Sequence, residues 1–315
     1  MKVTRVCLIC SAARSGSTLL DIVVGSHSQC ASLGEFSFLG KAIALGQDCS
    51  CGRLLVECPS WKIVFDRIRE ELSIDLIAQP YALNQWDTLA STVVDHKQQT
   101  SAYKALRKLR SLICDLRYYD ALGIGHHLPL PSTLSQGIRN TETLLQHVAS
   151  AWGVDLLVDS SKNVHKAIAL AQSNRVEARI VYLTRDGRGV YFSRRSSGFT
   201  RSEAVRGWLN YNRRANNLLP SLVPAKKLLR LRYEDLVADP NTASQTLYEF
   251  LELDNEPAIY EIDPTKSHLV NGNDMRFKGS QKMSADQRWK TEIDAQELAW
   301  FEKNAGDMNR QLGYS

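Results

Sequence analysis

A loop of small and hydroxyl-bearing residues near the N-terminus has the composition of an anion-binding site. Residues 11–18 read SAARSGST and lie between an apolar run and an apolar helical pattern. Free backbone N–H groups at the start of a helix, together with the positive end of its dipole, favour a bound oxyanion. Arg14 would add positive charge beside the turn at Gly16. The hydroxyl donors of the loop would be Ser15, Ser17 and Thr18.

The same loop lacks a residue that binding of a triphosphate requires. In the Walker pattern G-x-x-x-x-G-K-[ST], the lysine reaches the β- and γ-phosphates of ATP or GTP. Here Ser11 stands in place of the first glycine and Ser17 in place of the lysine, whereas Gly16 and Thr18 fit the pattern. A smaller oxyanion is therefore expected, and a P-loop kinase or ATPase stays open as an alternative.

Arg185 and Ser193 could form a second anion site. The arginine follows the apolar run 178–184, and the serine lies eight residues further on, within a predicted helix. A guanidinium fork and a hydroxyl donor suit an isolated phosphate monoester. An arginine–aspartate ion pair at the start of the helix is the structural alternative. Together, the loop at 11–18 and this second site favour a nucleotide that carries an anionic group at each end.

Three cysteines lie close together in the stretch CSCGRLLVEC. Cys49, Cys51 and Cys58 could be structural thiols, could include a disulfide or could bind a metal ion. Their C-x-C-x₆-C spacing lacks the paired C-x-x-C form of a strong zinc signal. The odd total of seven cysteines argues against a complete disulfide framework. The sequence leaves these alternatives open, and we assign no metal ligand from it.

Four strand–loop–helix units are expected to position these residues. Nearly continuous apolar runs at 3–10, 154–158, 178–184 and 227–232 each end in polar residues, and helical patterns follow. Runs that are apolar throughout indicate strands buried on both faces of a parallel sheet. The sequence therefore predicts an α/β fold with a P-loop-like, doubly wound and mostly parallel sheet flanked by helices.

The chain, 1–315, is expected to form a single domain with a helical insertion at about 45–140. Ligands of doubly wound folds bind at the carboxyl ends of the strands, so the insertion is expected to contribute to the site of a second substrate. Helices are predicted at 17–26 and 294–311. Residues 268–290 are rich in glycine, asparagine and basic residues, and they are predicted to form a loop.

The composition narrows the classes of function. The chain of 315 residues is 43% hydrophobic and 23% charged, which allows a large core. A net charge of +5 fits an anionic small molecule or polymer and is too weak to argue for nucleic acid. No apolar run approaches the ~20 residues of a membrane span. The short apolar run before Arg14 does not suit a signal peptide, so a cytoplasmic protein is expected.

Four motifs, in order along the chain, resemble those of a known enzyme family. RSGST at 14–18 is similar to the 5′-phosphosulfate loop of sulfotransferases that use 3′-phosphoadenosine 5′-phosphosulfate (PAPS). Arg185 and Ser193 resemble the 3′-phosphate motif of that family. The stretch LRLRYEDLVADP, with Tyr233, resembles a segment whose tyrosine lies by the adenine. Residues 268–290 resemble the C-terminal segment that covers the nucleotide in carbohydrate and bacterial members.

The resemblance implies a PAPS-dependent sulfotransferase of bacterial type, similar to the tyrosylprotein and carbohydrate branch. Glu35 would act as the base, and Lys162 and Arg14 would stabilise the leaving nucleotide and the transferred group. His27 and His165 are rival bases. The residues implied to bind PAPS, or its product 3′-phosphoadenosine 5′-phosphate (PAP), are Arg14, Ser15, Gly16, Ser17, Thr18, Arg185, Ser193, Tyr233, Arg276, Phe277, Lys278, Gly279 and Arg288.

The acceptor implied by the resemblance is a hydroxyl or an amine, and its identity stays open. Arg14 replaces the lysine of the cytosolic small-phenol members, which favours a carbohydrate, peptide or natural-product acceptor. A sulfuryl group carries less negative charge than a phosphoryl group, so no divalent metal is expected to be required. A non-catalytic PAP-binding module is a further alternative, beside the kinase or ATPase.

Overall fold

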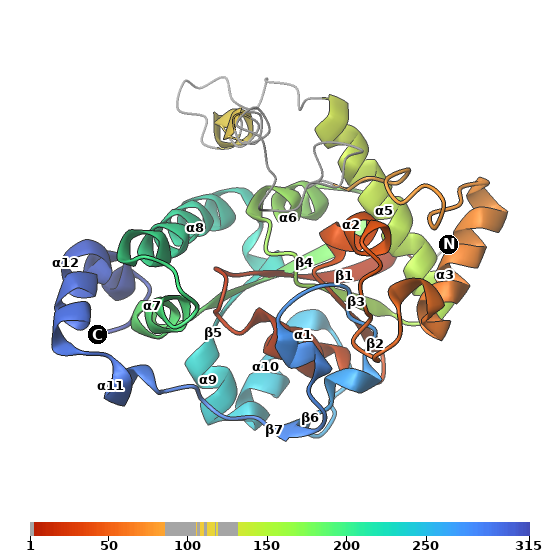
Figure 1. Cartoon of the computed structure of the whole chain (residues 1–315). Helices are drawn as coiled ribbons and strands as arrows, with labels where there is room; N and C mark the ends of the chain where they lie inside the picture. The colour runs from red at the N-terminus through yellow and green to blue at the C-terminus, as the bar shows by residue number, and fades with distance from the viewer. Residues whose placement is uncertain (1–2, 86–104, 106–107, 110–111, 117, 119–131) are drawn as a thin grey trace.

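Five parallel strands form the central sheet of the computed structural model, which describes residues 3–85, 105, 108–109, 112–116, 118 and 132–315 (Figure 1). The strand order is β2-β3-β1-β4-β5. The strands are β1 (Thr4–Cys10), β2 (Cys30–Gly34), β3 (Leu156–Asp159), β4 (Val176–Thr184) and β5 (Leu228–Arg232). The order reverses between β1 and β4, and open sheets bind ligands at such a point. The predicted α/β fold is confirmed.

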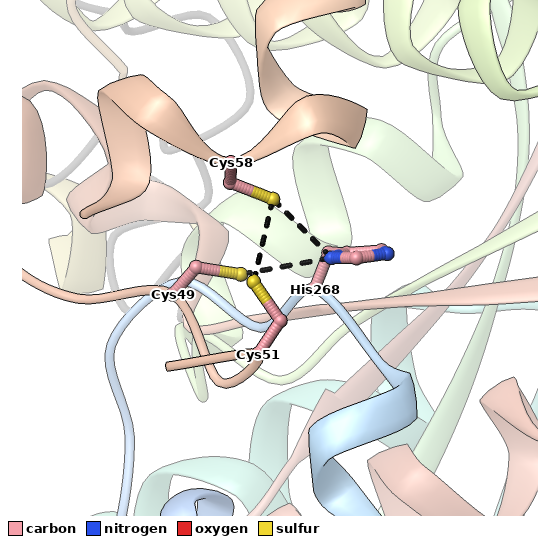
Figure 2. A group of neighbouring side chains, drawn as sticks. All are labelled: Cys49, Cys51, Cys58 and His268. Carbon is pink, nitrogen blue, oxygen red and sulfur yellow. Dashed lines mark hydrogen bonds between the residues drawn. The ribbon is translucent and has the colours of Figure 1, made fainter. Parts of the chain in front are cut away.

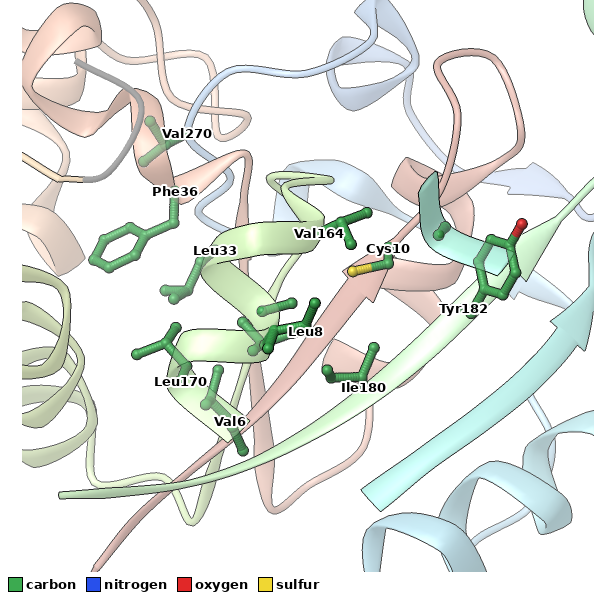
Figure 3. Packing of buried hydrophobic residues seen from close by; sticks show 14 of the residues in the cluster. Val6, Leu8, Cys10, Leu33, Phe36, Val164, Leu170, Ile180, Tyr182 and Val270 are labelled. Carbon is green, nitrogen blue, oxygen red and sulfur yellow. The ribbon is translucent and has the colours of Figure 1, made fainter. Parts of the chain in front are cut away.

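Different helices cover the two faces of the sheet. Along β1, Val6, Leu8 and Cys10 face one side, whereas Cys7 and Ile9 face the other, as the two-residue period of a strand requires. Figure 3 shows the first side, where β1 and β4 pack beneath helix α6. The helices of this side are α2 (Leu39–Ala44), α3 (Pro59–Leu72), α5 (Ser132–Trp152), α6 (Val164–Ala171), α7 (Gly187–Arg195), α8 (Arg201–Leu222) and α12 (Ala295–Gln311). The other side is covered by α1 (Ser17–Gly25), α9 (Tyr233–Ala238) and α10 (Pro240–Leu251).

Side-chain caps mark the start of the two helices that follow β3 and β4. Asn163 accepts a hydrogen bond from the backbone N–H of Lys166 at the start of α6. Asp186 accepts from the backbone N–H of Arg188 at the start of α7. Each such cap typically stabilises a helix by about 1 kcal/mol. Only a short turn therefore separates β3 from α6 and β4 from α7, and the cap fixes where each helix begins.

The predicted elements agree with the structure to within a few residues. The helices predicted at 17–26 and 294–311 correspond to α1 and α12. The segment 268–290, predicted to be a loop, contains the two-residue strand β7 (Gln281–Lys282), which pairs with β6 (Glu261–Ile262), and the start of α11 (Trp289–Glu292). Within the described part of the chain, every helix falls short of the length and hydrophobicity that crossing a membrane demands.

The helical insertion predicted at 45–140 lies only partly within the described residues. Its first part contains α3, whose buried face carries the apolar residues at helical spacing. Its proposed end at residue 140 falls inside α5, which packs against α3, α6 and the sheet. Residues 86–104 and 119–131 lie outside the described ranges, so the insertion there remains a prediction.

A C-terminal segment joins the edge of the sheet beside β2. Val270 forms a parallel bridge with Gly34: its backbone N–H donates to the carbonyl of Leu33 at 2.8 Å, and its carbonyl accepts from the N–H of Glu35 at 2.8 Å. Gly34 has a φ of +72°, and a Cβ there would lie 2.5 Å from the carbonyl oxygen of Val270. Glycine is therefore required for this close approach. The contact holds residues after Val270 next to the end of β2.

Asp21 is a carboxylic acid buried between α1 and the sheet. Its Oδ2 accepts a hydrogen bond of 2.5 Å from Ser160, and its carbonyl accepts one of 2.7 Å from Ser32. Burial raises the pKa of Asp21 from 3.8 to about 7, and the hydrogen bond from Ser160 only partly opposes this shift. The protonated acid is therefore the form that the fold favours.

The raised pKa of Asp21 predicts a pH-dependent loss of stability that Asp21→Asn removes. The stabilising preference for the protonated acid is fully present below 3.8, the unfolded value, and is lost as the pH rises through about 7. Relative to the wild type, the Asn variant should gain roughly 2–3 kcal/mol between pH 5 and pH 8. Chemical unfolding of both proteins at these pH values measures the difference. A difference that is independent of pH would contradict the prediction.

Candidate functional site

A cavity of about 710 Å³ opens at the carboxyl edge of the sheet. The turns after β1, β2, β3 and β4 line it, and a segment between residues 272 and 288 covers it. The volume lies within the range of small-molecule binding sites. The structure therefore brings together the loop after β1 and the strand-end residues that the sequence singled out.

Basic side chains outnumber acidic ones in the lining of this cavity. Among the described residues that line it, two are acidic, Glu35 and Asp286, and six are basic. Such a surplus of cations attracts an anionic ligand and raises its association rate. The six basic residues are Arg14, Lys162, Arg185, Lys278, Lys282 and Arg288.

The loop after β1 has the geometry of an anion cradle. Gly16 is the N-cap of α1 with a φ of +91°, and Arg14 also has a positive φ, of +71°. A Cβ at Gly16 would lie 2.5 Å from Cδ2 of Tyr233, so the tyrosine ring packs directly on the glycine. Ser17 and Thr18 line the cavity at the start of the helix. The N–H groups of the first turn thus lie at its wall.

Arg185 connects the loop, Tyr233 and the covering segment. Its Nη1 donates to the carbonyl of Arg14 at 2.9 Å, and its Nη2 donates to the carbonyl of Asp286 at 3.0 Å. The guanidinium carbon lies 4.6 Å from the centre of the Tyr233 ring. Ser193 lines the same cavity from α7. The two residues of the predicted 3′-phosphate motif therefore share one cavity with the loop at 14–18.

Asp286 forms an ion pair with Arg185 that the sequence did not predict. Its Oδ2 lies 3.4 Å from Nη2 of Arg185, and its Oδ1 accepts from Arg288 Nε at 2.8 Å. The hydrogen bond from Arg288, with the charge of Arg185, lowers the pKa of Asp286 to about 2. The structural alternative for Arg185 was an arginine–aspartate ion pair at the start of the helix. Arg185 does pair with an aspartate, but this is Asp286 of the covering segment, whereas Asp186 at the start of α7 pairs with Arg188 at 2.7 Å. Asp286 is one of two acidic residues, with Asp274, in the basic segment 268–290, and the sequence did not indicate which of them would pair with Arg185.

Glu35 and Lys162 meet at the wall of the cavity. Glu35 directly follows β2, and its Oε1 accepts a hydrogen bond from the ammonium group of Lys162. Its Oε2 accepts from Asn271 Nδ2 at 3.2 Å. Lys162 has a φ of +64° in the turn after β3, where Asp159 Oδ1 accepts from the backbone N–H of Ser161 at 2.8 Å. Asp159 at the end of β3 therefore orders the turn that carries Lys162.

The two rival histidines do not line the cavity. His27 is buried, and its Nε2 lies 2.9 Å from the carbonyl oxygen of Asp254. His165 is also buried, and its Nε2 lies 2.9 Å from Asp115 Oδ1. The ring of His165 stacks on Tyr118 with centroids 5.6 Å apart. Glu35 is thus the one predicted base that faces the cavity.

Several predicted nucleotide-binding residues lie outside the lining. Ser15 is buried, and Phe277 and Gly279 are exposed. Arg276 is buried, and its Nη1 donates to the carbonyls of Asp48 at 2.9 Å and Leu269 at 3.3 Å. Tyr233, Lys278 and Arg288 do line the cavity. The lining residues that the sequence analysis missed include Asn273, Lys282 and Asp286.

A family model described as "Sulfotransferase family" matches residues 7–257 of the chain. The sulfotransferase domain of the Synechococcus PCC 7002 olefin synthase is similar in structure, with a TM-score of 0.49, 19% identity and coverage of 100% of this chain and 97% of that chain. The sulfotransferase domain of the curacin biosynthetic pathway is similar with a TM-score of 0.49 and 19% identity, and the match covers 100% of this chain and 99% of that chain. Sulfotransferase STF9 of Mycobacterium avium has a TM-score of 0.41 and 12% identity, and the match covers 81% of this chain and 65% of that chain. No curated protein matches the chain significantly.

Proposed function

The chain belongs to the sulfotransferase family, and from this premise we propose that it moves a sulfuryl group from PAPS to an acceptor. The acceptor would be a hydroxyl or amine of a carbohydrate, peptide or natural product. The observation that carries the proposal is the convergence of Glu35 and Lys162 on the basic cavity that also contains the loop at 14–18 and Arg185. Proton transfer and anion binding would thus occur in one place.

The proposal places the two anionic ends of the donor on two strand ends. The 5′-phosphosulfate would lie on the loop at 14–18, where helix α1 begins. The 3′-phosphate would lie between Arg185 and Ser193. Arg185 would then exchange the carboxylate of Asp286 for the phosphate. Lys278 and Arg288 in the covering segment would add charge around the nucleotide.

The proposed reaction divides two tasks between Glu35 and Lys162. Glu35 would take the proton from the acceptor O–H or N–H while the acceptor atom forms its bond to sulfur. The bond between sulfur and the bridging oxygen would break, and PAP would leave with the electron pair on its 5′-phosphate. Lys162 would turn from Glu35 to this oxygen, and Arg14 would stabilise the transferred group. Arg14 can act only electrostatically, because its guanidinium keeps its proton.

The acceptor class and the contribution of the predicted insertion to its site are parts of this proposal. So are a cytoplasmic location and a reaction without divalent metal. The alternatives are a nucleotide kinase or ATPase and a non-catalytic PAP-binding module. Ser17 stands in place of the Walker lysine, which argues against the kinase or ATPase. The hydrogen bond between Lys162 and Glu35, the two residues with proposed catalytic roles, argues against the non-catalytic module.

Binding and turnover assays test the proposed function. PAP should bind much more tightly than ADP with Mg²⁺, and ³⁵S-labelled PAPS should lose its label to at least one member of a broad acceptor panel. Turnover should continue in buffer without Mg²⁺ during a short exposure to chelator. Hydrolysis of ATP that needs Mg²⁺, without transfer from PAPS, would support the kinase or ATPase. Tight PAP binding without any transfer would support the non-catalytic module.

A further inference from the structure

Four side chains converge at the edge of the sheet, away from the residues that line the cavity. They are Cys49, Cys51, Cys58 and His268 (Figure 2). Their potential ligand atoms all lie within 4.8 Å of one another. Cys49 and Cys58 are completely buried, and the other two are partly buried. The sequence analysis had found the three cysteines but not the histidine, which lies 210 residues after Cys58.

We propose that these four residues bind a structural zinc ion. In a tetrahedral site with Zn–S bonds of about 2.3 Å and a Zn–N bond of about 2.05 Å, two sulfurs lie about 3.8 Å apart, and sulfur and nitrogen lie about 3.5 Å apart. The Sγ atoms of Cys51 and Cys58 are 3.7 Å apart. Nδ1 of His268 lies 3.3 Å from Cys58 Sγ and 3.7 Å from Cys49 Sγ. These three distances are close to the edges of such a tetrahedron.

The ligand set favours zinc in a closed, structural site. Three thiolates and one imidazole form a Cys₃His set, which is typical of structural zinc. All four tetrahedral positions would be filled by protein, so no position would remain for a substrate. None of the four residues lines the cavity described above. The proposed zinc ion therefore has a separate place from the proposed transfer reaction.

A disulfide fits the geometry less well. Its two sulfurs would lie about 2.05 Å apart, whereas Cys51 and Cys58 keep their sulfurs at 3.7 Å and all three cysteines are free. A disulfide would also leave the third cysteine and His268 without a reason to converge. Simple buried thiols would not explain why an imidazole nitrogen points at two sulfurs.

The local backbone supports the cysteine ligands. The N–H of Cys49 donates to the carbonyl of Arg53 at 2.8 Å, and the N–H of Gly52 donates to the carbonyl of Cys49 at 2.9 Å. Gly52 has a φ of +82°, which closes this tight turn at low cost. Cys58 is the N-cap of α3, and the positive end of the helix dipole favours a thiolate there.

Hydrogen bonds hold His268 in the orientation that the site needs. Ser50, between two of the cysteines, donates its Oγ hydrogen to the carbonyl of Ser267 at 2.6 Å and accepts from the N–H of Leu269 at 3.0 Å. Trp61 Nε1 donates to the carbonyl of His268 at 2.8 Å. The residues on both sides of the histidine are thus tied to the cysteine loop and to α3. Such outer contacts are expected around a metal ligand.

The zinc ion would secure the start of the segment that covers the cavity. Two residues beyond His268, Val270 pairs with the edge of β2, and Asn271 donates to Glu35. The first residues of the cover that line the cavity, Gly272 and Asn273, follow directly. A metal bound by Cys49, Cys51 and Cys58 would therefore join the N-terminal part of the chain to this C-terminal segment. Its role would be to position Asn271 and the cover, and not to take part in the reaction.

Metal analysis of the purified full chain tests the zinc site without an activity assay. Protein purified without chelator or added metal should contain about one zinc ion per chain. Exchange with Co²⁺ should give the visible d–d bands of a tetrahedral site and thiolate-to-cobalt charge-transfer bands. Cys58→Ser should lower the zinc content at least about tenfold, because three ligands hold the ion far less tightly. Cys30→Ser removes a buried thiol outside the cluster, and it should keep the full zinc content.

A conservative variant keeps the test decisive if Cys58→Ser does not fold. His268→Cys offers four thiolates and should retain one zinc ion, with a stronger charge-transfer band in the Co²⁺ form. Hydrogen exchange of residues 267–273 should be faster in the zinc-free protein than in the zinc-bound protein. Absence of both zinc and the tetrahedral Co²⁺ spectrum in the wild type would overturn the proposal. So would a disulfide between two of the three cysteines, found by mass spectrometry after alkylation without reductant.

Discussion

Glu35→Gln is expected to lower the turnover of PAPS by a factor on the order of 10²–10⁴, the usual contribution of general-base catalysis. The glutamine keeps the size of the side chain and an oxygen that can accept from Lys162, but it cannot take a proton from the acceptor. Steady-state kinetics with labelled PAPS and a saturating acceptor measure the loss. The acidic limb of the wild-type pH–rate profile should disappear in the variant.

The affinity for PAP separates a base from a binding residue. Glu35→Gln should change PAP binding little, because its carboxylate is assigned to the acceptor. Lys162→Ala should reduce turnover and PAP affinity together, because Lys162 is assigned to the bridging oxygen. Glu57→Gln is a matched control, since it removes an exposed carboxylate outside the cavity and should leave both quantities unchanged. Near-full activity of Glu35→Gln, with loss of activity in folded His27→Ala or His165→Ala, would assign the base to a histidine.

Arg185→Ala is expected to weaken the binding of PAP by roughly 30- to 150-fold, or about 2–3 kcal/mol, which is the effect of removing a charged partner of a phosphate. Adenosine 5′-phosphosulfate lacks the 3′-phosphate, so its affinity should fall far less. Titration calorimetry with both ligands measures the two losses. Equal losses would refute the placement of the 3′-phosphate at Arg185.

A second substitution controls for the structural contacts of Arg185. The side chain also donates to the carbonyls of Arg14 and Asp286, so its removal could disturb the loop and the cover. Arg185→Lys keeps the charge and loses the bidentate fork, and it should bind PAP with intermediate affinity. Thermal unfolding of all variants, measured alongside, identifies any general loss of stability.

The sequence by itself predicted the sheet and the edge where the site lies. Apolar runs of strand length are buried on both faces because helices cover both sides, so their position is visible without a structure. Parallel strands end at the same edge, and in the structure this brings Glu35, Lys162 and Arg185 together although they are far apart in the chain. The glycine and serines of the loop at 14–18 indicated a turn that opens a helix, and α1 begins at Ser17.

Only the tertiary structure decided which side chains meet across distant loops. Residues 268–290 are irregular, so no period indicates which side chain faces the nucleotide. Lys278 lines the cavity, whereas Arg276 turns to the carbonyl of Asp48, and Asp286 pairs with Arg185. Likewise, the cysteine spacing gave no sign of His268 as a fourth ligand. Local patterns encode backbone conformation and burial, but contacts between such loops depend on how the whole chain packs.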